Sequence, residues 1–397
     1  MNTERQRTSR LLEILIVFLR LGLTSFGGPI AHLGYFRDEF VTRRRWLTDS
    51  AYADIVALCQ FLPGPASSQA GFAIGVQRGG LLGGIAAWAG FTLPSALLML
   101  AFAYGTSVFS GPWGEGILQG LKLVAVAIVA QAIWGMARTL TPDIVRGAIA
   151  VAAAVAVLFL ETAAVQISVI AGGAVLGLIF CRNGDPTTTT HMHSGVKRRK
   201  AIVALVLFAA IFAILPLFDK LNSPALSLFG AFYQAGALVF GGGHVVLPLL
   251  ETSLVGPGWV DHETFLAGYG AAQAMPGPLF TFAAYLGAVA FANPNSLAGA
   301  AIGLIAVFLP GLLLVYGAMP FWDALRRQSL GQAAMKGANA AVVGILVAAF
   351  YDPVWTSGVS GAVDVVLALA GFLALVILKA PPWTVVLALA AAGAIFH

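Results

Sequence analysis

The chain has few charged residues and almost no cysteine. Of its 397 residues, 10% are Asp, Glu, Lys or Arg, and Cys59 and Cys181 are the two cysteines. Two cysteines without a metal-ligand spacing exclude a disulfide framework and a cysteine zinc site. The apolar segments also lack the paired-carboxylate, Cys/His and HExxH patterns of common enzymes. Apolar side chains are abundant instead: 59% of residues are hydrophobic and the mean hydropathy is +0.89.

This composition is typical of an integral membrane protein and excludes an ordinary soluble domain. Most apolar segments are close to the roughly 20 residues that span hydrocarbon. They lie near 11–27, 51–78, 81–109, 117–138, 144–160, 163–181, 201–218, 225–241, 264–292, 297–319, 334–350, 361–378 and 382–396. The net charge of +5 is interpreted as loop anchoring and not as nucleic-acid binding, because Lys and Arg fall in short segments between these runs. No removable signal peptide is expected at the basic start.

Five motifs occur twice in the same order, which predicts an internal duplication. The pairs are FGGP at 26–29 with FGGG at 240–243, RW at 45–46 with GW at 258–259, QFLPGP at 60–65 with QAMPGP at 273–278, LPSALLML at 93–100 with LPGLLLVY at 309–316, and GLKLVAVAIV at 120–129 with GANAAVVGIL at 337–346. We therefore expect a first repeat over residues 1–181, a basic linker with a connecting transmembrane helix over 182–224, and a second repeat over 225–397.

Loop charges predict that the two repeats are inverted. The loop after FGGP carries Arg37 and Arg43 to Arg45, whereas its counterpart carries Glu251, Asp261 and Glu263. By the positive-inside rule these loops face opposite sides of the membrane, and the other comparable loops follow the same inversion. Loop charges also favour about nine full crossings with four re-entrant segments, two of them at 11–27 and 51–78. Hydropathy alone would give thirteen spans. The predicted fold is an all-α polytopic membrane protein of two inverted repeats, with its N-terminus cytoplasmic and its C-terminus extracytoplasmic.

Two proline-flanked glycines interrupt the apolar segments, at LPGP (62–65) and MPGP (275–278). Each proline removes a backbone donor and clashes with the preceding turn, so a helix break is predicted in both places. A single break would favour a structural kink, but its repetition beside a glutamine in both halves favours a transport site, since irregular backbone at membrane depth is tolerated in protein-lined cavities. A helix that begins at Pro65 would leave amides free to attract an anion.

The predicted substrate-binding residues are the groups at these breaks, the glycines of the FGG motifs, and Lys122 as a fixed positive charge. They are Gly27, Gly28, Gln60, Gly64, Ala66, Ser67, Ser68, Gly241, Gly242, Gln273, Gly277, Leu279, Phe280, Thr281 and Lys122. An interfacial role is equally compatible with Lys122. The candidates for proton coupling are, in order, Glu251, Glu39, Asp54 and His32. No catalytic residue, metal or cofactor is predicted, and the triplet HMH at 191–193 is interpreted as an inert part of the linker.

These motifs resemble those of a known family. FGGP followed by His32, a loop ending in RRRWL, CQFLPGP, and then FGGGHVVLPLLE, GW and FLAGYGAAQAMPGPLFTFAAYLG are similar to the two-domain members of the chromate ion transporter family over nearly the whole chain. The resemblance implies a bacterial-type, multi-pass plasma-membrane carrier that exports chromate and uses the proton motive force.

The sequence is also compatible with two other functions. No residue distinguishes chromate from sulfate, so a permease for sulfate or another tetrahedral oxyanion is the first alternative. A membrane-embedded enzyme that acts on a lipid or redox substrate is the second. The expected partners are chromate or sulfate and the lipid bilayer, with no nucleic acid, and the sequence leaves open whether the protein forms a homodimer.

Overall fold

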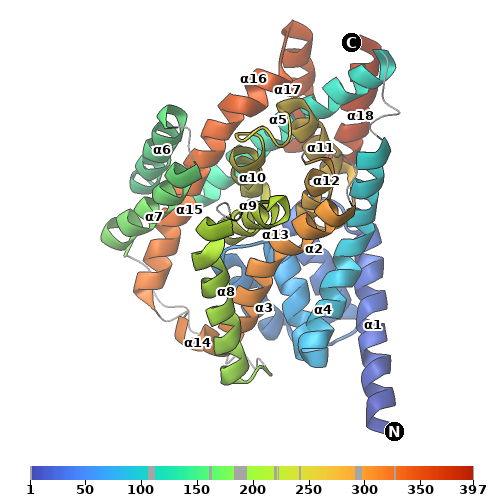
Figure 1. The fold of residues 1–397 in the computed structure, drawn as a ribbon, viewed down its shortest axis with the longest axis vertical. Coiled ribbons are helices and arrows are strands. Elements are labelled where there is room, and N and C mark those ends of the chain that lie inside the picture. The colour runs from blue at the N-terminus through green and yellow to red at the C-terminus, as the bar shows by residue number, and fades with distance from the viewer. Residues whose placement is uncertain are drawn as a thin grey trace.

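The computed structural model describes residues 2–105, 112–160, 163–182, 195–218, 221, 223–240, 243–290, 297–325 and 328–396. These residues form helices and connecting turns, and no strand occurs among them. The α-helices of the first half are α1 (Asn2–Thr24), α2 (Gly28–Arg37), α3 (Asp49–Phe61), α4 (Ala66–Gly105), α5 (Pro112–Leu140), α6 (Ile144–Phe159) and α7 (Ala163–Phe180). A connecting helix, α8 (Arg198–Phe218), leads to the second half (Figure 1).

The second half contains ten α-helices among its described residues. They are α9 (Pro224–Ala237), α10 (Val246–Leu254), α11 (His262–Ala274), α12 (Phe282–Val289), α13 (Leu297–Ala318), α14 (Trp322–Leu325), α15 (Ser329–Ala349), α16 (Thr356–Gly358), α17 (Ala362–Val376) and α18 (Pro382–Phe396). Short 3₁₀ or π-helical turns are named η. In the first half η1 (Asp38–Arg43) follows α2, and the second half has η4 (Gly243–Val245), η5 (Leu279–Thr281), η6 (Met319–Phe321) and η7 (Phe350–Trp355).

The prediction of an all-α polytopic membrane protein is confirmed. Five stretches within the described residues are long and apolar enough to cross a bilayer: Ala66–Gly105, Trp113–Leu140, Arg198–Phe218, Leu297–Leu325 and Ser329–Gly358. The longest one bends at Gly79 and Gly80, where Gly80 has φ +67°, so α4 consists of two arms over 66–78 and 81–105. The count of nine crossings with four re-entrant segments stays a prediction.

Both halves use the same order of elements. A first helix (α1 or α9) ends at the FGG motif, a short helix (α2 or α10) follows, and a third helix (α3 or α11) ends at the PGP motif. The third helix begins alike in both halves, because the side chains of Thr48 and Asp261 accept hydrogen bonds from the amides of Ala51 and Thr264. The duplicated motifs therefore sit at equivalent places in the two halves.

Helices of the two halves are interleaved. Helix α5 of the first half packs against α17 and α18 of the second, while α15 of the second half packs against α6 and α7 of the first (Figure 1). Small residues let the backbones approach closely, as in other membrane helix pairs. A Cβ built at Gly337 in α15 would overlap the carbonyl oxygen of Gly173 in α7. Each half therefore contributes helices that pack against helices of the other half.

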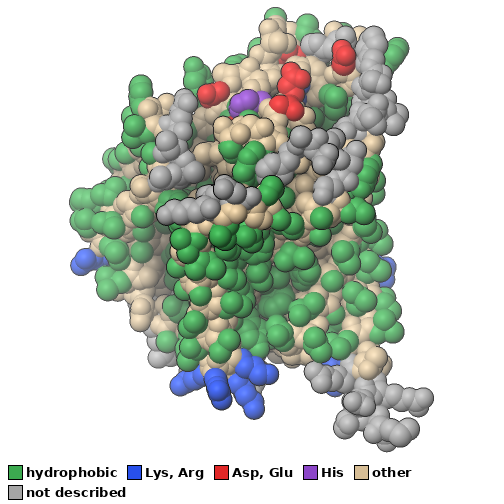
Figure 2. All heavy atoms as spheres, in the orientation of Figure 1, with side chains coloured by type: hydrophobic (Ala, Val, Ile, Leu, Met, Phe, Trp, Pro, Cys, Tyr) green, Lys and Arg blue, Asp and Glu red, His purple; other side chains and the backbone are tan. Residues whose placement is uncertain are grey.

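On the face drawn in Figure 2, a broad belt of hydrophobic side chains separates a cluster of Lys and Arg at one end from Asp, Glu and His side chains at the other. Acidic residues near the basic end pair with arginines, as Glu39 does with Arg43 and Arg44. The apolar belt is what a lipid-facing surface requires, because hydrocarbon cannot solvate charge.

The close approach of α15 and α7 predicts a selective effect of glycine substitution. Gly337→Ala forces these backbones apart, at a cost of about 1–3 kcal/mol for overpacking, so the unfolding temperature in detergent should fall by several degrees. Gly135→Ala in α5 is the matched control, because a Cβ there meets nothing within 4 Å and alanine favours the helix. Equal unfolding temperatures for the two variants, measured by thermal denaturation, would contradict this packing.

Candidate functional site

The first half contains two interruptions of its helices, one at the FGG motif and one at the predicted LPGP break. Helix α1 ends at Thr24. Gly27, which precedes α2, and Gly28, its first residue, adopt φ values of +100° and +79°. Helix α3 ends at Phe61, Gly64 turns the chain with φ +122°, and α4 begins at Ala66 directly after Pro65. Left-handed φ values are accessible to glycine and strained for other residues, which explains the glycine at each turn.

The second half repeats these breaks with one difference. Helix α11 ends at Ala274, and Gly277 turns the chain with φ +94°. The next residues, Leu279 to Thr281, form a 3₁₀ turn before α12, whereas α4 begins as an α-helix directly after Pro65. The amide and hydroxyl of Thr281 both donate to the carbonyl of Pro278. The predicted Gly241 and Gly242, like the triplet at 191–193, lie outside the described residues.

A reciprocal pair of hydrogen bonds joins the two halves at the breaks. The amide of Gly64 donates to the carbonyl of Val239 (2.7 Å), and the amide of Gly277 donates to the carbonyl of Ser25 (2.8 Å). Val239 and Ser25 are equivalent positions, each directly before an FGG motif. The expectation that the Gly64 amide is free was therefore wrong, because it satisfies a carbonyl exposed by the unwound backbone of the other half.

The side chain of Gln69 ties the same region together. Its Nε2 donates to the carbonyl of Pro63 in the break (2.9 Å) and to the carbonyl of Gly311 in α13 (3.1 Å). Gly311 lies in α13 directly after the proline at 310. Gln69 thus links the first break to the second half.

A buried polar cluster surrounds the first break. Nδ1 of His32 lies 3.3 Å from the hydroxyl of Ser67, and the imidazole packs edge-on against Phe91, with ring centroids 5.2 Å apart. His32, Ser67 and Ser68 are 1%, 3% and 2% exposed. The residues of this cluster come from α2, from the start of α4 and from the second arm of α4.

Several atoms here are buried without a hydrogen-bond partner in the structure, namely Oγ of Ser25, Nε2 of His32, Oγ of Ser68, Oε1 of Gln69 and Oγ1 of Thr92. An unsatisfied buried polar group costs about 1–3 kcal/mol. Sequence reasoning missed Ser25 and Thr92. A comparison of the two halves would have identified them, because these polar residues correspond to the apolar residues Val239 and Phe308 in the second half.

The other predicted binding residues are dispersed. Gln60 is exposed at the end of α3, Gln273 is half-buried, and Ala66 is half-buried at the start of α4. Lys122 in α5 is 9% exposed and its Nζ lies 3.6 Å from Oε1 of Glu263, so its charge is already paired. Leu279 and Phe280 are buried in the 3₁₀ turn after the second break.

The coupling candidates occupy four different environments. Glu39 is held by Arg43 (2.8 Å) and Arg44 (2.6 Å). Asp54 is 7% exposed on α3. His32 belongs to the polar cluster, and Glu251 lines a separate cavity.

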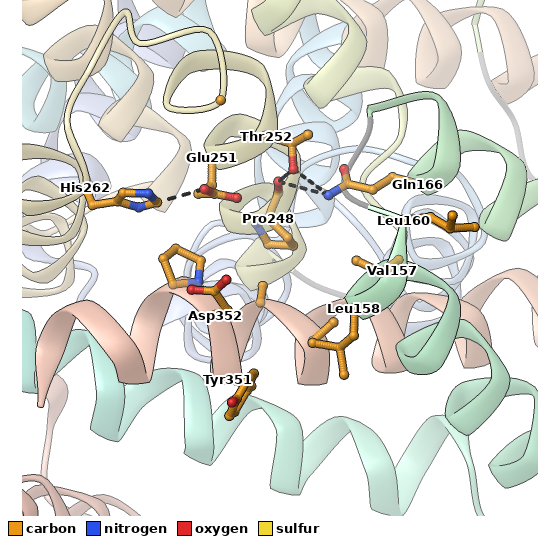
Figure 3. Close-up of a pocket in the computed structure, with 14 residues that line it drawn as sticks. Val157, Leu158, Leu160, Gln166, Pro248, Glu251, Thr252, His262, Tyr351 and Asp352 are labelled. Atoms are coloured by element: carbon orange, nitrogen blue, oxygen red, sulfur yellow. Dashed lines mark hydrogen bonds and ion pairs between the residues drawn. The ribbon is translucent and has the colours of Figure 1, made fainter.

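That cavity, of about 340 Å³, lies between the halves (Figure 3). Its walls come from the ends of α6 and α7, from α10, and from the junction of α15 with η7. Oε1 of Glu251 lies 3.9 Å from Nδ1 of His262, and Asp352 adds a second carboxylate. Opposite them, Gln166 donates to the hydroxyl of Thr252 (2.7 Å). Two carboxylates repel a dianion, so this cavity suits a proton or a cation.

Broken helices that meet between two similar halves, inside a belt of apolar helices, are typical of a membrane transporter. The sequence profile described as "Chromate transporter" matches residues 12–178 and 226–394, one region in each half. The protein therefore belongs to the chromate transporter family and is a two-domain member of it.

The chain is similar to several named proteins. It is 28% identical to the chromate transport protein of Pseudomonas aeruginosa over 86% of this chain and 80% of that protein. It is 27% identical to the chromate transport protein of Cupriavidus metallidurans, over 86% and 82%. An uncharacterized transporter of Methanocaldococcus jannaschii is 26% identical, over 87% and 85%. No solved structure matches the chain.

The two hydrogen bonds of Gln69 predict a stability loss on its replacement. Gln69→Met leaves the carbonyls of Pro63 and Gly311 without this donor, at about 1–3 kcal/mol each, so the unfolding temperature in detergent should fall. Gln60→Met is the control, because Gln60 is an exposed glutamine in the same region. A fall of the same size in both variants would show that Gln69 does not brace the break.

Proposed function

We propose that the protein exports chromate across the plasma membrane and that the proton motive force drives this export. The observation that carries the proposal is the pair of helix breaks that hydrogen-bond reciprocally across the two halves beside buried polar side chains. Membership of the chromate transporter family and two relatives named chromate transport proteins support chromate as the substrate. Sulfate is the rival substrate, because both ions are tetrahedral dianions.

We further propose how the chain sits in the membrane. By the positive-inside rule the end with Lys and Arg faces the cytoplasm and the acidic end faces outward (Figure 2). The N-terminus is then cytoplasmic and the C-terminus extracytoplasmic. The two halves act as inverted repeats, and rocking of one against the other exposes the breaks alternately to the two sides.

The cavity beside Glu251 is the proposed entry point for protons. It lies at the acidic end, and its ionisable lining residues are Glu251, Asp352 and His262. A proton taken up there from outside would move inward down its electrochemical gradient and drive the anion outward, and both movements would carry positive charge into the cell. The other coupling candidates do not line this cavity; they are Glu39, Asp54 and His32.

Substitution at the turning glycines tests the role of the breaks. Gly64→Leu and Gly277→Leu place a side chain at φ values above +90° and against Gly311 and Phe91. We expect each to lower chromate flux into inverted vesicles at least about tenfold, which corresponds to about 1.4 kcal/mol in the transport barrier.

Gly258→Leu is the control, because its φ is also positive but a Cβ there meets nothing within 4 Å. Unchanged flux in both break variants, at equal expression, would remove the breaks from the mechanism. Competition by sulfate in the same assay distinguishes the rival substrate. Conversion of chromate into another product would favour a membrane-embedded enzyme.

Replacement of Glu251 tests the proton entry. Glu251→Gln should lower chromate flux driven by an imposed pH gradient about tenfold, because the amide cannot take up a proton, while chromate still binds. The control is Glu115→Gln, an exposed carboxylate in the first turn of α5. Flux that follows the pH gradient equally in both variants would rule out Glu251 as the coupling residue.

A further inference from the structure

The polar cluster of the first half has an apolar counterpart in the second. The repeated motifs set the register, and at five of six positions a polar first-half residue corresponds to an aliphatic or aromatic second-half residue, while the sixth pair is Ser68 with Thr281. The other five pairs are Ser25 with Val239, His32 with Val246, Ser67 with Phe280, Gln69 with Phe282 and Thr92 with Phe308. The two copies have therefore kept their backbone breaks and diverged in side-chain chemistry.

The counterpart region is filled by packed rings. Phe280 lies 5.8 Å from Phe308, measured between ring centroids, and Phe282 lies 5.2 Å from Phe265. Phe280, Phe282 and Phe308 are 3%, 0% and 0% exposed. The hydroxyls nearby already have partners: that of Thr281 donates to its own turn, that of Tyr285 donates to the carbonyl of Thr264, and that of Tyr269 lies 2.7 Å from Nδ1 of His244. Nε2 of Gln273, just before the second break, is buried without a partner, so this region offers an oxyanion one unsatisfied side-chain donor where the first half offers several.

In the first half, the corresponding region contains buried polar groups without hydrogen-bond partners. The hydroxyls of Ser25, Ser68 and Thr92 are buried and without a partner. Native structures satisfy most buried polar groups, so a group of unsatisfied donors at one place indicates a ligand that they bind in another state of the protein.

The two arms of α4 bring these donors to one level. Gly75 packs against Gly83, and the side chain of Val76 lies against Gly84, so the arms run antiparallel from the bend. Ser67 and Ser68 then lie opposite the turn that holds Phe91 and Thr92. His32 contacts both arms, through Ser67 and through Phe91. The start of α4 adds the positive end of its helix dipole at this level.

We propose that the transported oxyanion has a single binding site, in the first half, where the hydroxyls of Ser67, Ser68 and Thr92 and the imidazole of His32 donate to it. The second half is the scaffold against which this site opens and closes. The inference rests on the proposed function for the class of substrate, a tetrahedral dianion. Uncharged donors suit a carried ion, because they bind it without a salt bridge that would slow its release.

The test separates binding from stability. Ser68→Ala and Thr92→Val each remove a hydroxyl without a partner, so both variants should unfold at the wild-type temperature or above it in the absence of ligand. Their dissociation constants for chromate and for sulfate should rise about tenfold or more. Both quantities come from thermal denaturation in detergent with increasing chromate or sulfate, since a bound ion raises the unfolding temperature.

Thr281→Val is the matched control, because Thr281 occupies the position of Ser68 in the second half. It loses a hydrogen bond to Pro278, so its unfolding temperature should fall while its dissociation constants stay at the wild-type values. Weakened binding in Thr281→Val, or wild-type binding in both first-half variants, would overturn the single site. A wild-type protein that binds neither chromate nor sulfate would instead contradict the proposed function itself.

Discussion

Backbone polar groups at membrane depth have no water to satisfy them, so each break in a helix requires a protein partner. In this protein the partner of each PGP break is the FGG region of the other half. The amide of Gly64 meets the carbonyl before one FGG motif, and the amide of Gly277 meets the carbonyl before the other. Because the bonds cross between halves, neither half can keep its irregular backbone alone. The interleaving of α5 with α17 and α18, and of α15 with α6 and α7, follows the same reciprocal pattern.

Duplication preserved this backbone arrangement while the side chains changed. The glycines and prolines of both breaks are retained, since they set the turn and the exchanged hydrogen bonds. The side chains beside them are free of that requirement, which allowed one copy to hold His32 and Ser67 where the other holds Val246 and Phe280. A buried aromatic cluster packs and stabilises by removing apolar surface from water. A buried polar cluster without partners costs stability, and its retention indicates a functional constraint.

Charge is distributed so that anions and cations meet different parts of the molecule. The polar cluster near the first break contains no carboxylate among its described members, whereas Glu251 and Asp352 line the cavity at the acidic end (Figures 2 and 3). Lys122, which appeared suited to binding an anion, is paired with Glu263. The structure therefore separates a region of neutral donors from a region that attracts positive charge, as a carrier that exchanges an anion against protons would require.

Much of this organisation is determined by the sequence itself. Hydropathy determined the helical membrane class, proline and glycine chemistry determined where helices break, and the repeated motifs determined which positions are equivalent, because all three depend on local residue types. Only the tertiary structure decided what the breaks touch. The hydrogen bonds of Gly64 and Gln69 reach residues far along the chain, and the contact of His32 with Ser67 depends on how α2 packs on α4. Such partners follow from packing between the halves, which no local pattern encodes.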